Sequence, residues 1–391
     1  MRATANPAGP AELSRELVRL EPEFLVHFSA PAGMAYQVTM WLPHLARVGR
    51  PFAVVVREAE HLAPVAAATS VPVLHCPSIR ALDLVVPRNL RAVYYVNNGM
   101  KNVHMLRFTG PLHVQLLHGD SDKTASFNPV TALYDRVYVA GQAGVDRYRA
   151  NGVNIPAERF RIVGRPQLAG ITVGPRRNHP PGPPTVLYAP TWTGFYEDTN
   201  HCSLAIAGAI ISGLLGRGVT VILRAHPSTS RNRRAAAHLA AAERLLARDR
   251  AATGREHLWG DRSACEMSLV DCVNASDALI ADVSSVVTDY LYSGRPFAIT
   301  DMANAGAALA STFPLSRIGY VIDPGLATLE HVLDAMLGPD PLAERRLAAR
   351  AHYLGDAAAE AYEHVFVDAV RADLDGATTV TVSGDTEWAT S

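Results

Sequence analysis

The sequence predicts an α/β protein with two Rossmann-like, doubly wound domains that face one another across a cleft. Three observations lead to this prediction. Short apolar strand patterns alternate with helical patterns along most of the 391 residues, which is typical of parallel βαβ units. A proline-rich stretch near the middle interrupts the alternation, which then restarts. Polar clusters follow several predicted strands, and open α/β sheets bind ligands at those strand ends.

The first half, residues 20–173, is predicted to form one complete domain. Its helices are expected over 34–48, with a break at Pro43, over 99–107 and over 142–150. Its strands are expected at 23–29, 51–56, 71–74, 91–96, 114–117, 136–140 and 161–163.

Residues 174–184, GPRRNHPPGPP, are predicted to be a linker. The segment carries five prolines, and proline supports neither a helix interior nor a central strand, so an extended connection is expected.

The second half, residues 185–376, repeats the alternation. Its strands are expected at 185–189, 219–224, 278–281 and 297–300, and its helices at 203–215, 232–249, 265–274, 286–294, 326–337 and 340–375. The polar residues 377–391 are predicted to be a disordered tail.

Composition excludes several classes of protein. Hydrophobic residues make up 48% of the chain, charged residues 19%, and the net charge is -1, so no basic field indicates a nucleic-acid partner. No apolar run is long enough to span a bilayer, and residues 1–20 lack a signal-peptide pattern, which predicts a cytoplasmic protein. The four cysteines form no CxxC pair and are expected to be buried free thiols. Neither the histidine spacing nor any glycine-rich motif predicts a metal or cofactor.

Residues 276–296, SDALIADVSSVVTDYLYSGRP, are the most informative stretch. An apolar strand ends at Asp282, and a helix follows with Ser284 and Ser285 in its first turn. Serine at this position typically caps the helix by accepting a backbone N–H bond. The same helix N-terminus could instead bind a phosphate or diphosphate. The local sequence leaves both interpretations open.

Three further polar clusters follow predicted strands: HGDSDK at 118–123, TWT at 191–193 and RAHP at 224–227. Together with the serine cluster, the motifs LLHGDSDK, LYAPTW and ILRAHP resemble the CDP-glycerol glycerophosphotransferases of teichoic-acid and capsule synthesis, which have the GT-B fold. The resemblance covers about residues 110–300. It implies a first domain that binds the acceptor and a second domain that binds the nucleotide donor.

The resemblance also implies a reaction. A CDP-glycerol or related CDP-alcohol donor gives its polyol phosphate to a hydroxyl of a polyol-phosphate or glycan acceptor, and CMP leaves. The acceptor could be lipid-linked, with peripheral contact at the inner face of the cell membrane. From the composition and the histidine spacing, we expect a transfer without a metal, a cofactor or a nucleic-acid partner.

Individual residues take roles from the same resemblance. His118 corresponds to the general base, and His226 to a second histidine on the donor phosphates. Each histidine has a structural alternative: a ring tied to backbone at a strand end, or a packed ring before Pro227. Substrate-binding roles are implied for Gly119, Asp122, Lys123, Thr191, Trp192, Arg224, Asp282, Ser284, Ser285 and Asp289.

Several of these roles remain open. Arg224 could pair with a phosphate or with a carboxylate across the sheet. Asp289 could accept from ribose hydroxyls or be an ordinary surface residue of its helix. Asp282 could orient the serine loop instead of touching substrate. Asp122 could orient His118, and Lys123 could meet an anionic acceptor.

The chain also departs from the family pattern. Residues 120–123 replace a basic, proline-containing segment, which leaves the acceptor open. Ala225 and Val283 stand where the family often has proline and tyrosine, so CDP-ribitol is an alternative donor. The other functions considered are a nucleotide-sugar glycosyltransferase or 2-epimerase of the same fold, and a non-catalytic nucleotide-binding protein.

Overall fold

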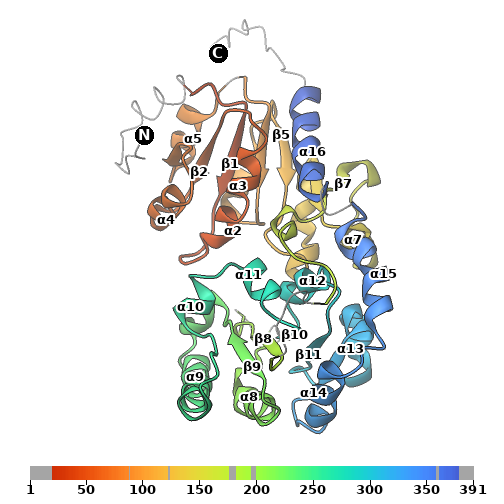
Figure 1. The fold of residues 1–391 in the computed structure, drawn as a ribbon. Helices are drawn as coiled ribbons and strands as arrows, with labels where there is room; N and C mark the ends of the chain where they lie inside the picture. The colour runs from red at the N-terminus through yellow and green to blue at the C-terminus, as the bar shows by residue number, and fades with distance from the viewer. Residues whose placement is uncertain are drawn as a thin grey trace, which may run out of the picture.

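The computed structural model describes residues 20–87, 89–121, 124–175, 182–194, 200–357 and 361–377. It contains two entirely parallel sheets, which lie one above the other in Figure 1. The predicted α/β class and GT-B-like arrangement are confirmed. Residues 176–181 of the predicted linker and residues 378–391 of the predicted disordered tail lie outside the described residues.

The first sheet has seven strands in the order β3-β2-β1-β4-β5-β6-β7. Helices cover both faces of such a sheet, so its central strands are mostly apolar, and every residue of β1 is buried, including His27. The predicted strand 114–117 begins and ends two residues earlier, at Leu112 and Gln115. The strands are β1 (Phe24–Phe28), β2 (Phe52–Val56), β3 (Val73–His75), β4 (Ala92–Tyr95), β5 (Leu112–Gln115), β6 (Arg136–Val139) and β7 (Phe160–Ile162).

The predicted helix 34–48 is two short helices. Pro43 occupies the first turn of the second one, where its missing N–H costs no hydrogen bond. Two further helices, α4 and α5, were not predicted. The helices of this half are α2 (Tyr36–Thr39), α3 (Leu42–Ala46), α4 (Leu62–Ala67), α5 (Ile79–Val85), α6 (Val103–Leu106) and α7 (Gln142–Ala150).

The second sheet has five strands in the order β12-β11-β10-β8-β9. Strand β10 is central, and all five of its residues are buried, including Asp282 at its end. The short edge strand β12 was not predicted. The strands are β8 (Thr185–Ala189), β9 (Thr220–Leu223), β10 (Ala278–Asp282), β11 (Phe297–Thr300) and β12 (Tyr320–Ile322).

Two predicted helices of this half differ from expectation, one in its start and one by a break. The helix expected at 265–274 starts at Leu269, because Ser268 and Asp271 form a capping box there. The helix expected at 340–375 is broken at Gly355, which has a φ of +84°. The helices are α8 (Ala207–Gly216), α9 (Arg233–Thr253), α10 (Asp261–Ala264), α11 (Leu269–Asn274), α12 (Ser285–Leu291), α13 (Leu309–Thr312), α14 (Leu329–Leu337), α15 (Ala343–Leu354) and α16 (Tyr362–Gly376).

Helix α16 returns to the first half, as Figure 1 shows. Its apolar side chains Phe366 and Val370 belong to the same buried core as Phe24 and Trp41. This placement differs from the expected assignment of all C-terminal helices to the second domain. We therefore propose that the second domain ends before α16 and that this helix completes the first domain.

The cysteines differ from expectation at one position. Cys76, Cys202 and Cys272 are buried, whereas Cys265 is exposed, and none of the four forms a disulfide. The prediction of a buried thiol is therefore wrong for Cys265. No helix within the described residues is long and apolar enough to cross a bilayer.

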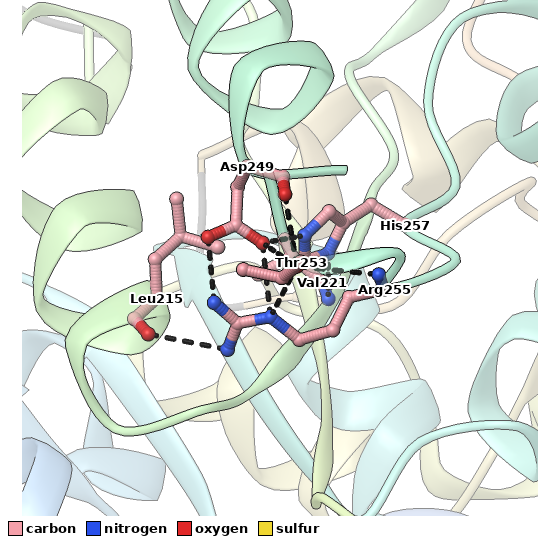
Figure 2. Close-up of polar contacts among 6 residues, drawn as sticks. All are labelled: Leu215, Val221, Asp249, Thr253, Arg255 and His257. Atoms are coloured by element: carbon pink, nitrogen blue, oxygen red, sulfur yellow. Dashed lines mark hydrogen bonds and ion pairs between the residues drawn. The ribbon is translucent and has the colours of Figure 1, made fainter. Parts of the chain in front are cut away.

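A polar clip fastens the end of α9 to the edge strand β9 (Figure 2). The Asp249 carboxylate accepts hydrogen bonds from Arg255 Nη2 at 2.6 Å and from His257 Nε2 at 2.9 Å. His257 Nδ1 in turn accepts from the Val221 backbone N–H at 3.0 Å. Leu258 pairs with the β9 backbone, so the outer edge of β9 is covered instead of left open.

We expect Asp249→Ala to lower the free energy of unfolding by about 1–3 kcal/mol at pH 7, because the variant leaves the fully buried His257 without its acceptor. Burial alone would raise the pKa of Asp249. Hydrogen bonds from Arg255, His257 and Thr253 outweigh that effect and lower the pKa below its usual value. The stabilisation is thus present above pH 3.8 and is lost as the pH falls further.

Urea denaturation at pH 7 and at successively lower pH measures this difference. Asp368→Ala is the matched control, since that carboxylate is exposed on α16. An equal loss for both variants at pH 7 would contradict the proposed clip.

Candidate active site

The polar clusters predicted at strand ends meet where the two sheets face each other. Gly119, which follows β5, is so close to α12 that a Cβ there would lie 3.2 Å from Ser285 Oγ. The Tyr36 ring of the first half lies 6.0 Å from the His226 ring of the second, centroid to centroid. Figure 1 shows α12 at the junction between the two halves. His118, Gly119, His226 and Ser285 therefore belong to one region.

A strained turn presents His118 to this region. Leu117 has a φ of +56°, in the left-handed region that a leucine rarely adopts. Two hydrogen bonds hold the turn: the Leu117 carbonyl accepts from Trp41 Nε1 at 2.8 Å, and its N–H donates to Gln115 Oε1 at 3.1 Å. Backbone strain of this kind persists only where its surroundings impose it, and it concentrates at functional sites.

The His118 ring has a defined protonation state. Its Nδ1 lies 3.2 Å from the Val96 carbonyl oxygen, which can only accept, so Nδ1 carries the proton. Its Nε2 faces the Gln37 amide nitrogen at 3.3 Å. Burial lowers the pKa of His118 to about 4; the bond to Val96 opposes the shift, and the charge of Arg165 adds to it. The ring is neutral at pH 7, with its lone pair on Nε2.

In His226 the roles of the two ring nitrogens are reversed relative to His118. Its Nδ1 accepts a hydrogen bond from the Ser228 backbone N–H at 3.0 Å. In the neutral ring the proton is therefore on Nε2. The ring stacks on Trp192, with centroids 5.8 Å apart and an angle of 17° between the planes. It caps the 3₁₀ helix η9 (Pro227–Arg231), so the histidine before Pro227 is both a local structural element and part of the region between the halves.

Tyr36 stands between the two histidines. Its ring meets His118 edge-on at 6.3 Å and His226 edge-on at 6.0 Å, with interplanar angles of 86° and 88°. The preceding loop reaches the same part of the second half, because Arg231 donates a hydrogen bond to the Ala32 carbonyl. The Tyr36 ring of the first half thus contacts both imidazoles and lies between them.

Asp282 organises the strand ends of the second half. Its carboxylate is fully buried and accepts from the Thr191 N–H at 2.6 Å, from the Ser203 N–H at 3.2 Å and from Thr300 Oγ1. Burial raises the pKa of Asp282 to about 6 against these bonds. The side chain holds the loop after β8, including the segment that carries Trp192. A positioning role therefore fits its geometry.

Ser284 occupies the N-cap position of α12, but its hydroxyl does not cap the helix. Of the two interpretations left open, the side-chain cap is wrong, because Ser284 Oγ makes no hydrogen bond within the described residues although the residue is only 8% exposed. Thr288 Oγ1, one turn later, is likewise buried without a partner there. A buried hydroxyl left unpaired is costly, so a hydrogen-bonding group of a ligand would stabilise this end of the helix.

Asp289 is neither a surface residue nor open to a ribose. It is buried, and its Oδ1 forms an ion pair with Arg165 Nε at 2.7 Å. Arg165 comes from the first half, just after β7, so the pair joins the two halves. Burial raises the pKa of Asp289, and Arg165 opposes that shift. The surface interpretation is wrong. In this structure the Asp289 carboxylate oxygens, which could accept from a ribose, are engaged by the Arg165 guanidinium.

Within the described residues Arg224 does not take the second role considered for it, the pairing with a carboxylate across the sheet. Its Nη1 donates to the backbone carbonyls of Ser263 and Met267, the latter at 2.8 Å. It thereby ties the end of β9 to the segment around α10. Among the described residues, its hydrogen bonds are to backbone oxygens and to Cys272, with no carboxylate partner.

The remaining predicted residues divide into two groups. Thr191 is buried and bonded to Asp282, while Trp192 lies against His226. Asp122 and Lys123 lie outside the described residues. Their neighbour Asp120 is buried and pairs with Arg147 on α7.

Sequence reasoning missed Tyr36, Gln37, Asn97 and Arg165. Tyr36 and Gln37 belong to a four-residue helix that shows no apolar period. Asn97 follows β4, and Arg165 follows β7 and Gly164. A search for polar residues after every predicted strand would have found Asn97 and Arg165, since ligand sites of parallel sheets lie at those ends.

A family model matches a stretch that begins just before the linker and extends into the second half. The model of CDP-glycerol:poly(glycerophosphate) glycerophosphotransferase matches residues 172–303, which include His226 and the whole serine cluster. This segment is similar to the glycerophosphotransferase family. The resemblance drawn from the motifs is confirmed, and the assignment as a CDP-glycerol glycerophosphotransferase-like transferase is confirmed with it. No curated protein sequence matches the chain.

Solved structures resemble this chain over nearly its whole length. The wall teichoic acid polymerase TagF has a TM-score of 0.57 and 16% identity, covering 93% of this chain and 94% of its own. A UDP-N-acetylglucosamine 2-epimerase, described as putative, from Listeria monocytogenes has a TM-score of 0.59 and 10% identity, covering 92% and 98%. MurG from Acinetobacter baumannii has a TM-score of 0.56 and 12% identity, covering 90% of this chain and 99% of its own. At these identities the likeness shows the fold alone.

Proposed function

We propose that this chain transfers glycerol phosphate, or a related polyol phosphate, from a CDP-linked donor to a hydroxyl of a cell-wall or capsule polymer, with release of CMP. One observation supports it most. Two histidines from opposite halves face the same tyrosine ring, and their hydrogen bonds give them opposite polarity: His118 offers a lone pair, and His226 offers an N–H. Proton removal and proton donation are the two needs of such a transfer.

His118 acts on the acceptor. Its Nε2 takes the proton of the acceptor hydroxyl while that oxygen attacks the distal phosphorus of the donor. The new P–O bond joins acceptor and glycerol phosphate, and the bond to the bridging diphosphate oxygen breaks. Because the ring is neutral at pH 7, its lone pair is available without prior deprotonation.

His226 acts on the leaving group. Its Nε2–H donates to the departing CMP phosphate and stabilises the negative charge that forms there. The stacked Trp192 holds the ring, and the Ser228 N–H fixes its tautomer. The family match supports this assignment, because His226 lies within residues 172–303.

The N-terminal end of α12 holds the diphosphate. Ser284 Oγ is buried and unpaired within the described residues, and the N–H groups of Ser285 and Val286 at the start of the helix have no carbonyl four residues earlier in the helix to bond. A diphosphate oxygen would satisfy both. Support for a CDP-linked donor comes from the family model and from a TagF structure determined after a soak with CDPG, which is similar to this chain with a TM-score of 0.54.

The acceptor rests on the family resemblance alone. We propose a polyol-phosphate or glycan polymer, carried on a lipid at the inner face of the cell membrane. The first half would bind it, because His118 lies there.

A donor comparison tests the proposal. CMP release is measured from CDP-glycerol and CDP-ribitol, and UDP release from a UDP-sugar, each with and without a short polyol-phosphate acceptor. We expect acceptor-dependent CMP release from a CDP-alcohol and none from the UDP-sugar. Turnover of the UDP-sugar alone would favour a glycosyltransferase or epimerase. Nucleotide binding without turnover of any donor would favour the non-catalytic alternative.

A further inference from the structure

A chain of side-chain amides runs from the end of β4 to His118. The Gly99 N–H donates to Asn97 Oδ1 at 3.1 Å, which fixes the orientation of the Asn97 amide. Asn97 Nδ2 then donates to Gln37 Oε1 at 2.8 Å. With its oxygen engaged in this way, Gln37 directs its nitrogen toward His118 Nε2 at 3.3 Å. Both amides are buried, at 9% exposure each.

The direction of every bond in this chain is determined. An amide NH₂ group can only donate, so the nitrogen it faces on His118 must be the acceptor. The other ring nitrogen faces the Val96 carbonyl at 3.2 Å and must be the donor. Reversing either amide would place like groups against each other, N–H against N–H or oxygen against oxygen.

We propose that Gln37 is a positioning residue that, held by Asn97, keeps the lone pair of His118 on Nε2, the atom that faces the acceptor hydroxyl. Gln37 acts through His118 and does not itself take up the proton. Its N–H also occupies the Nε2 lone pair until a substrate hydroxyl replaces it. The inference rests on the proposed function, in which His118 is the general base.

The amide also acts on the charge of the ring. A protonated Nε2–H would face the donor N–H of Gln37, so this contact favours the neutral imidazole. It works alongside burial and the nearby charge of Arg165, which also lower the pKa of His118. Tyr36 is another titratable side chain that meets the ring, and burial raises its own pKa.

Two substitutions reverse the bond. In Gln37→Glu, a carboxylate replaces the donor, so His118 would protonate Nε2 to donate to it. In Asn97→Asp, the carboxylate requires a donor from Gln37, whose amide would turn and present Oε1 to His118. Asn97→Asp changes the tautomer of His118 through the contact of residue 97 with Gln37 and the contact of Gln37 with His118. It does so without replacing any atom that touches the His118 ring. Gln142→Glu on α7 is the matched control, since the Gln142 amide contacts Asp146.

The imidazole ¹⁵N shifts of the unliganded protein, labelled at histidine, give the tautomer directly. His118 signals are assigned by their loss in His118→Asn. We expect an Nδ1–H ring in the wild type and in Gln142→Glu, and an Nε2–H ring with a raised pKa in Gln37→Glu and Asn97→Asp. An Nε2–H ring in the wild type, or an Nδ1–H ring in a folded Gln37→Glu or Asn97→Asp protein, would overturn the proposal.

Kinetics add a second readout. We expect Gln37→Glu to lower kcat for CMP release by roughly 10–100-fold, less than loss of the base, with little change in KM for the donor. If Gln37→Glu fails to fold, Asn97→Asp decides the matter. The tautomer measurement needs no substrate. If the predicted tautomers are observed but no CMP is released, only the proposed function is contradicted. If CMP is released but the tautomers differ from those predicted, only the role of Gln37 is contradicted.

Discussion

Replacing His118 by alanine is expected to lower acceptor-dependent CMP release by roughly 10²–10⁴-fold, the range that general bases contribute. The variant removes the only group that we propose takes the acceptor proton. Binding of the CDP-linked donor should remain, because its proposed contacts are at His226 and the start of α12 in the second half. The measurement is steady-state CMP release, together with donor affinity by calorimetry.

The pH dependence of the wild type makes this prediction sharper. Burial lowers the pKa of His118 to about 4. A base must be unprotonated, so kcat/KM should be flat through neutral pH and fall as the pH drops through about 4. An acid limb near 6.5, the pKa of an unperturbed histidine, would contradict the assignment.

His331→Ala is the control for this substitution, because His331 is exposed on α14. It should leave CMP release unchanged. Equal activity of His118→Ala and the wild type would remove His118 from the mechanism, whatever the donor.

Removing Arg165 is expected to have the largest effect on stability. Arg165→Met leaves the buried Asp289 carboxylate without its partner, and loss of one member of a buried ion pair costs about 3–5 kcal/mol. Because the pair joins the two halves, the variant should also loosen their contact. Urea denaturation measures the free energy of unfolding, and limited proteolysis measures the loosening.

The deficit of Arg165→Met should depend on pH. Burial already raises the pKa of Asp289 in the folded protein, and loss of Arg165 raises it further. A group with a raised folded pKa favours folding at low pH and loses that contribution as the pH rises through the folded pKa. The deficit should therefore be smaller at pH 5 than at pH 8.

A second variant separates lost charge pairing from lost packing. Arg165→Met combined with Asp289→Leu removes both charges and should recover most of the stability, since hydrophobic replacement of a whole buried pair is often neutral. Arg250→Met, at a partly exposed ion pair on α9, is the control and should change stability little. A double variant no more stable than Arg165→Met would show that packing, not charge, sets the cost.

The strand ends of the second half could be read from the sequence because each signal is local. An apolar run, a polar residue and a new helical period identify the end of β10 and the start of α12 within a few residues. The same patterns located His118 and His226 after their strands. The signal for the break at Gly355 is also local, a single glycine. It was missed because the sequence on both sides of it has a helical pattern.

The contacts between the halves could not be predicted in this way. Arg165 and Asp289 are 124 positions apart, and neither residue signals the other. The polarity of His118 depends on Gln37 and Asn97, which come from separate turns of the chain. Ser284 shows a different failure: its position allowed a side-chain cap, but its hydroxyl makes no capping hydrogen bond to the helix.

The most direct test of the proposed transfer follows the acceptor itself. The protein is incubated with CDP-glycerol and a short polyol-phosphate acceptor, and the acceptor mass and the CMP formed are measured together. We predict one glycerol phosphate added to the acceptor for each CMP released, and both products lowered by roughly 10²–10⁴-fold with His118→Ala. CMP formed without a change in acceptor mass, or an acceptor extended by a sugar from a UDP-linked donor, would contradict the proposed transfer.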